Sequence, residues 1–138
     1  MDDLTITAAS FVPSANANII RGVAGEDLTQ AQTVYLDPQT NSYKKAKANG
    51  AAPLYRVAGL SCNGASAGQP FLIVVSDPAL EIGADVAAGD VLIASANPGG
   101  ICLDANKASG WFVTVLALGI GNNLVTLLAP STSPIAIP

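Results

Sequence analysis

The side chains that most often carry out enzymatic chemistry are scarce in this chain. It contains no histidine, so it lacks the commonest general base and the imidazole of serine and cysteine hydrolases. Most acidic residues stand beside glycine, proline or alanine in expected turns, where aspartate usually caps the backbone or is solvated. The sequence therefore predicts no catalytic residue and a protein that is not an enzyme. A carboxylate pair for glycoside hydrolysis would have to come from Glu26, Asp27, Asp37, Asp77, Glu81, Asp85, Asp90 and Asp104.

Residues that hold cofactors or metals are equally sparse. The glycine steps 83–85 and 119–121 lack the strand, helix and downstream acid that a dinucleotide site requires, so they predict turns. Cys62 and Cys102 lie far apart, with no histidine or second nearby cysteine, which argues against a zinc site or a redox pair. We expect two reduced, partly buried thiols, although a disulfide between them stays open because it depends on their Cα separation. No cofactor and no metal are expected.

Charge and hydropathy narrow the set of partners. Only 12% of the 138 residues are charged, half are apolar, and the net charge is −4. The negative balance opposes binding to nucleic acid, and the one basic group, Lys44, Lys45 and Lys47, is typical of a solvated loop. The longest apolar run, 111–120, is about half a membrane span, so no membrane is expected. Met1-Asp2-Asp3 has the wrong charge for a secretory signal, which predicts a protein made without export.

Short turns that feed apolar runs organise the chain. Glycine steps at 67–69, 88–90 and 109–111 each combine a glycine suited to positive φ with a following run of β-forming residues. Asp37-Pro38 starts a further turn of type I character. This rhythm predicts an all-β domain with no substantial helix. The expected strands are 18–23, 33–36, 54–60, 71–75, 91–95, 101–103, 111–118 and 124–128.

The chain divides into three parts on this interpretation. Residues 1–20 read as an extended N-terminal arm, residues 21–129 as one β domain, and residues 130–138 as a proline-rich tail. The runs 71–75 and 111–118 are apolar on both faces, which predicts strands buried on both sides. Without helices, the second face must pack on another sheet or on another subunit. A compact β-barrel or β-sandwich is the expected architecture.

Six segments share a pattern of turns and strand starts: Leu4-Thr5-Ile6-Thr7-Ala8-Ala9-Ser10, Gly22-Val23-Ala24-Gly25-Glu26, Val34-Tyr35-Leu36-Asp37, Ala67-Gly68-Gln69-Pro70, Ser95-Ala96-Asn97-Pro98-Gly99-Gly100-Ile101 and Ser109-Gly110-Trp111-Phe112-Val113-Thr114-Val115-Leu116. Together they resemble small structural proteins of tailed bacteriophages, the capsid decoration or cement family. The resemblance spans residues 4–128 and rests on turns and strand starts. One departure is Ala31 before Gln32, where such proteins often carry glycine; if that turn needs positive φ, alanine costs about 1 kcal/mol.

The resemblance implies a compact, β-tulip-like domain that acts as a homotrimer on the outer capsid surface of the virion. Its partner is then the major capsid protein, and its role is to stabilise the assembled shell after synthesis in the host cytoplasm. We expect the apolar arm, with Leu4, Ile6, Phe11 and Val12, to contact the shell by adding a strand to an exposed sheet edge. The alternative is that the arm packs on its own domain.

A competing interpretation is an adhesive module of a head fibre or tail that binds a host surface glycan. Such a module needs exposed aromatic side chains on which sugars stack. Tyr43 and Tyr55 are the best candidates, since the other aromatic residues lie in expected core strands. The few aromatic residues make this the weaker of the two interpretations.

Overall fold

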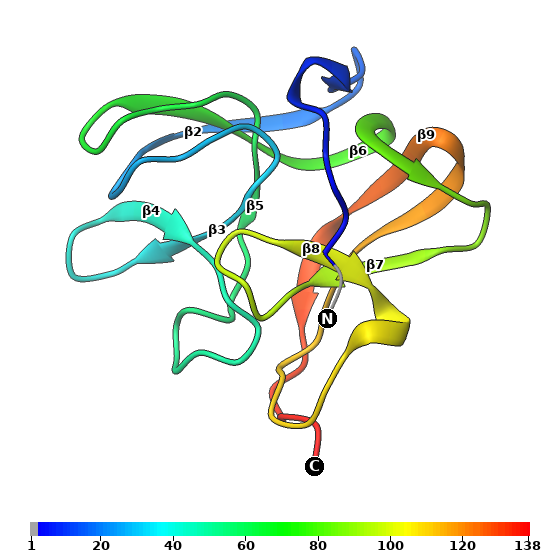
Figure 1. Ribbon diagram of the computed structural model, residues 1–138. Helices are drawn as coiled ribbons and strands as arrows, with labels where there is room; N and C mark the ends of the chain where they lie inside the picture. Colours follow the sequence, from blue (N-terminus) through cyan, green and yellow to red (C-terminus); the bar gives the residue numbers. More distant parts are fainter. Residues whose placement is uncertain (1–2) are drawn as a thin grey trace.

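Strands make up nearly all regular structure in residues 3–138, the part of the chain that the computed structural model describes (Figure 1). The remaining elements are two short 3-10 helices. This confirms the all-β class. In chain order the elements are η1 (Ala8–Ser10), β1 (Phe11–Val12), β2 (Asn18–Val23), β3 (Thr33–Asp37), β4 (Ser42–Lys45), β5 (Gly59–Ser61), β6 (Pro70–Val86), β7 (Val91–Ala94), β8 (Ile101–Leu103), η2 (Asp104–Asn106) and β9 (Thr114–Thr132).

The long strand β6 joins the two halves of the molecule. Its first half pairs antiparallel with β2 and β5, and its second half pairs with β1 and β9. The sequence prediction of a strand over 71–75 was therefore too short. Asp77 and Pro78 resemble a turn in the sequence, yet Asp77 lies opposite Leu127 of β9 and the strand continues after a register shift.

The half that holds β2 to β5 curls into a partial barrel. The strands run in the order β4-β3-β5-β6, and β2 lies on β6. Directly after β2, Ala24 forms a parallel bridge with Tyr43 of β4, and the Gly25 N–H donates to the Tyr43 carbonyl at 2.7 Å. This contact brings the two ends of the curl together. The side chains enclosed there are Ala24, Leu28, Val34, Phe71 and Ile73.

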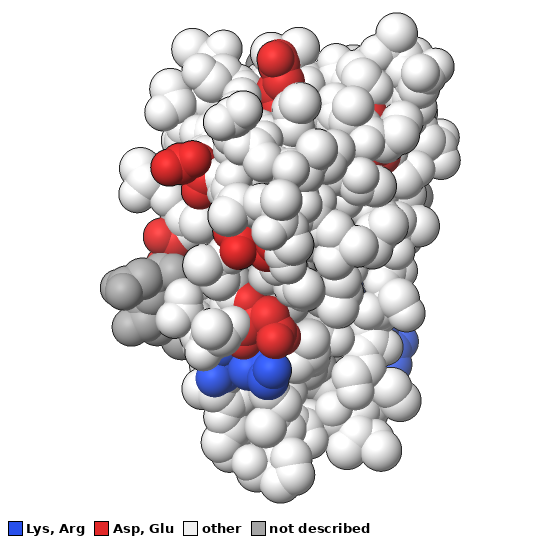
Figure 2. All heavy atoms as spheres, turned by 90° about the vertical axis from the view of Figure 1, so that its right-hand side faces the viewer, with Lys and Arg blue, Asp and Glu red and all other residues white. Residues whose placement is uncertain are grey.

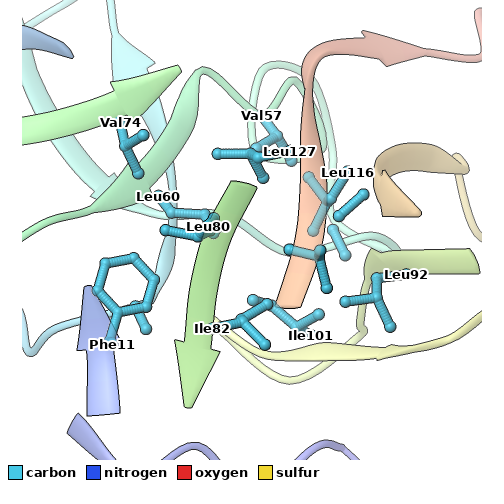
Figure 3. Close-up of a cluster of buried hydrophobic side chains, with 14 of the residues drawn as sticks. Phe11, Val57, Leu60, Val74, Leu80, Ile82, Leu92, Ile101, Leu116 and Leu127 are labelled. Carbon is cyan, nitrogen blue, oxygen red and sulfur yellow. The ribbon is translucent and has the colours of Figure 1, made fainter. Parts of the chain in front are cut away.

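The other half is built around β9, which doubles back on itself. Its first part pairs with β7 and its second part with β6, and the Thr114 and Thr132 hydroxyls at its two ends are 2.7 Å apart (Figure 1). Inward-facing side chains of both halves meet in the main core (Figure 3). Its largest members include Phe11, Leu60, Val74, Leu80, Ile82, Leu92, Ile101, Leu116, Val125 and Leu127.

The turns that lead into strands have the predicted geometry. Gly68, Gly89 and Gly110 have φ of 88°, 90° and 87°, in the region that L-residues rarely adopt. Ala31 also has positive φ, 64°, so alanine occupies a left-handed position in this chain. The strain of about 1 kcal/mol is opposed by burial of its methyl group in the main core.

Several further local sequence predictions were wrong, among them the loop expected at Lys44 and Lys45, which belong to β4. Most of the expected strand 54–60 is not a strand. Its first residues lie in a turn, in which the Leu54 N–H donates to the Ala51 carbonyl and the Arg56 N–H to the Pro53 carbonyl, residues 56–58 have no regular structure, and only the short β5 follows. Residues 83–85 do not end a strand but continue β6 through a distortion at Gly83, where φ is 84°. The strand expected at 111–118 begins at Thr114, since the Trp111 backbone pairs with Ile137 instead.

Candidate functional site

Several acidic side chains of this protein accept hydrogen bonds from backbone N–H groups in turns and loops. The Asp27 carboxylate accepts the Ala67 N–H at 3.0 Å, that of Asp37 accepts the Gln39 N–H at 3.0 Å, and that of Asp90 accepts the Ala87 N–H at 2.9 Å. Within residues 3–138, no group of three or more metal-ligating side chains is placed to hold a metal ion. These carboxylates therefore act as backbone caps.

Both cysteines are free thiols in separate parts of the core. Cys62 is half-buried beside the main core, and Cys102 is buried in a cluster with Ile93 and Trp111. Burial raises the pKa of each thiol to about 11. Because the thiolate is the reactive form, both are poor nucleophiles at neutral pH.

The N-terminal arm is tied to its own domain. The Leu4 N–H donates to the Ile101 carbonyl at 2.8 Å, and Leu4 and Ile6 pack against the main core. Phe11 is 3% exposed and projects from β1 toward Leu80 and Ile82 (Figure 3). Of the four residues expected to contact a shell, only Val12 keeps a largely exposed side chain, at 47%.

A buried carboxylate fastens this arm. Asp77 is 1% exposed and accepts hydrogen bonds from the Ser14 N–H at 2.7 Å, the Ala79 N–H at 3.0 Å and the Ser14 hydroxyl. All of these donors belong to neutral groups, so the carboxylate is satisfied without a cation. The contact fixes the chain between β1 and β2 against the middle of β6.

One exposed apolar surface lies on β1, β6 and β9, and we call it the β9 surface: Val12, Glu81, Leu118 and Ile120. Val12 lies opposite Glu81, which in turn lies opposite Leu124 of β9. Leu118 and Ile120 project from the first part of β9, where Leu118 lies opposite Val91. Their neighbours Ala117 and Val125 point into the main core, so the β9 surface is the opposite face of the sheet.

A second exposed apolar surface lies on β2 and the start of β6, and we call it the β2 surface: Ile19, Arg21, Val23 and Leu72. The three β2 residues alternate along the strand and so share one face. Arg21 lies directly opposite Leu72. The three aliphatic side chains are 41–43% exposed, and a hollow of about 330 Å³ opens beside Arg21, Asn63 and Leu72.

Sequence reasoning did not predict either surface. The available signal was the presence of large aliphatic residues at consecutive positions of β2 and of the run into β9. Such runs are also typical of strands buried on both faces. Only the three-dimensional packing shows that the second face stays exposed at these places.

The two tyrosines proposed for sugar stacking differ in their surroundings. Tyr43 is half-buried and packs edge-on against Phe71. The Tyr55 ring stacks on Phe112 at 3.8 Å, and the Arg56 guanidinium lies 5.8 Å from the centre of the Tyr55 ring. Tyr55 and Arg56 line a hollow of about 240 Å³ with Thr132, Ser133 and Pro134.

Charged side chains are few on the face shown in Figure 2, which looks onto the right-hand side of Figure 1. Acidic residues are scattered over it, basic residues are rare, and most of the surface is uncharged. A polyanion would find no basic stripe on this face. An uncharged face is better suited to contact with another protein.

The chain has no match in either sequence comparison with known proteins. No model of a known protein family matches it, and no curated protein matches it. In the part of the chain that the structure describes, no helix is long and apolar enough to cross a membrane. The class that the fold defines is thus an all-β domain whose distinguishing features are two exposed apolar surfaces.

Proposed function

We propose that this protein is a capsid decoration protein of a tailed bacteriophage. It binds the outside of the assembled head, contacts the major capsid protein and stabilises the shell as a homotrimer. The observation that carries the proposal is the pair of exposed apolar surfaces on a domain with little charge. The resemblance of residues 4–128 to the cement family supports the same function.

Shell stabilisation by such a protein needs no chemistry. A protein that binds the assembled shell and not its separated subunits shifts the equilibrium toward the shell by mass action. Several weak contacts from one oligomer add up through effective concentration when they reach neighbouring shell subunits. A β domain with no catalytic residues is sufficient for this role.

Binding to undecorated heads tests the proposal. We expect the purified protein to co-sediment with heads and to occupy regular lattice points across the shell in electron micrographs. Decorated heads should release their DNA at a higher temperature than bare heads. Failure to bind assembled heads at micromolar concentration, or binding to the tail alone, would contradict the proposal.

The Tyr55 hollow favours a second candidate function, an adhesive module that binds a host glycan. Tyr55, which stacks on Phe112, offers an aromatic wall, Arg56 offers a cation, and two hydroxyl residues complete the rim. Nuclear magnetic resonance titration with host surface glycans tests this candidate. Shifts confined to Tyr55 and its neighbours, lost in Tyr55→Ala, would support it.

A further inference from the structure

The β2 and β9 surfaces carry opposite single charges. Arg21 is the only charged residue of the β2 surface, and neither β2 nor residues 70–76 contain an acidic residue. Glu81 is the only charged residue of the β9 surface, and β1, β6 and β9 contain no lysine or arginine. Each surface therefore places one charge among exposed aliphatic side chains.

Within residues 3–138, no ion pair neutralises either charge. The ion pairs found in residues 3–138 join Lys44 to Asp37 and Lys107 to Asp104, and neither pair involves Arg21 or Glu81. The hollow beside Arg21 is lined by Asn63, Pro70, Phe71 and Leu72, none of which offers a carboxylate. Arg21 is thus free to meet a carboxylate supplied from outside.

The two surfaces lie on different halves of the molecule. The β2 strand pairs with the first half of β6 and β9 pairs with its second half, and Figure 1 shows β2 at the left and β9 at the right of the molecule. One copy therefore cannot bring its own surfaces together. A second copy can, because it presents to each surface the aliphatic residues and the opposite charge that the surface lacks.

We propose that the β2 surface of one copy docks on the β9 surface of the next, with Arg21 facing Glu81. Such a contact joins two different surfaces, so it repeats head to tail and closes into a ring when the rotation between copies allows. The proposal deepens the proposed function, because it names the contact that builds the homotrimer. It also assigns Val12 to the contact between copies instead of the contact with the shell.

Charge reversal tests the contact by sedimentation velocity of the full chain over a range of concentrations, with no heads present. We expect the wild-type protein to associate, and Arg21→Glu and Glu81→Arg each to weaken association by about tenfold or more. The double variant Arg21→Glu/Glu81→Arg should restore association to about the wild-type level, because it exchanges the two partners. Lys47→Glu, an equal charge change in the loop after β4, is the control and should change nothing.

Three outcomes would overturn the contact: a monomeric wild-type protein, single variants that associate normally, or a double variant that fails to regain association. Unfolding in urea checks that each variant is folded. Head binding by the same variants separates this proposal from the function. A monomeric wild-type protein that binds heads would remove the contact and the homotrimer but keep the decoration role. Rescue by charge exchange without head binding would keep the contact and remove the decoration role.

Discussion

The sheet formed by β7, β8 and β9 has one face turned away from the main core, and the two ends of that face differ. At one end, Ile93 and Cys102 are fully buried beneath Trp111, and Ile137 of the C-terminal tail packs there as well. At the other end, Leu118 and Ile120 are 42% and 47% exposed. The same sheet face is thus a core at one end and a surface at the other.

Backbone pairing explains how the covered end is built. The Ile137 N–H donates to the Trp111 carbonyl at 2.9 Å, and the Gly110 N–H donates to the Ile137 carbonyl at 2.8 Å. The tail is therefore held as an extra extended segment over the loop that carries Trp111. Apolar residues of similar type are thus buried by Trp111 and the tail at one end of the sheet face and left exposed at the other. This favours a role for the exposed end in binding another molecule.

The largest expected effect on stability comes from removing the Trp111 side chain that buries one end of the sheet face. Trp111→Ala deletes a side chain that is 2% exposed, and we expect it to lower the free energy of unfolding by about 3–5 kcal/mol. Leu118→Ala at the bare end should lower it by less than about 1 kcal/mol. Equilibrium unfolding in urea measures both. Equal losses of unfolding free energy in the two variants would show that one end is not a core and the other a surface.

A smaller effect is expected from releasing the arm that brings Val12 to the β9 surface. Asp77→Ala leaves the Ser14 and Ala79 N–H donors without their acceptor, which should cost about 2–3 kcal/mol. The amides of β1 should then exchange with deuterium faster. Asp85→Ala, which removes an exposed carboxylate from the same strand, is the matched control. Unchanged exchange at β1 would contradict the fastening role of Asp77.

Still smaller changes in stability are expected at the bare end itself. The double variant Val12→Ser/Ile120→Ser removes exposed methyl groups, so the free energy of unfolding should change by less than about 1 kcal/mol. Association between copies should nevertheless weaken by about tenfold, since the contact loses apolar area. Sedimentation and urea unfolding of the same sample separate the two properties. A large loss of stability with normal association would assign these residues to the core.

The sequence predicts the turns of this fold better than the extent of its strands. Turn glycines such as Gly68 are recognisable because their requirement for positive φ is local. The length of β6 is not local, since the Asp77-Pro78 step stays within the strand only because Ser14, far away in the sequence, satisfies the Asp77 carboxylate. The turn over 51–56 replaces an expected strand for a similar reason, as the Lys47 N–H donates to the Leu54 carbonyl.

The candidate surfaces depend even more on distant parts of the chain. The run from Trp111 to Leu118 is apolar except for Thr114, which predicts burial on both faces. Trp111, at its beginning, is buried because the C-terminal tail packs there. Leu118, at its end, is exposed because no described segment packs over it. Periodicity cannot predict where a tail docks, so the boundary between core and surface required the structure.

The smallest effect is expected at the β3–β4 hairpin, a surface that is stabilised by charge and not by apolar cover. Lys44 Nζ lies 3.0 Å from the Asp37 carboxylate. The hydrogen bond with Lys44 lowers the pKa of Asp37, and the same bond raises the pKa of Lys44. The Asp37 contribution is present above its ordinary pKa of 3.8 and is lost as the pH falls through the lowered value.

The Lys44 contribution has the opposite sign: it is present below the ordinary pKa of 10.5 and is lost as the pH rises through the raised value. Lys44→Gln should therefore lower the thermal midpoint slightly between about pH 4 and pH 10, and hardly at all outside that window. High salt should shrink the difference, because both groups are partly exposed to solvent. Arg56→Gln, whose charge has no ion-pair partner in residues 3–138, should show no such window. If Lys44→Gln lowered the thermal midpoint equally at every pH, the Lys44 side chain would stabilise the hairpin by packing alone. Charge would then not distinguish the hairpin from the two apolar surfaces.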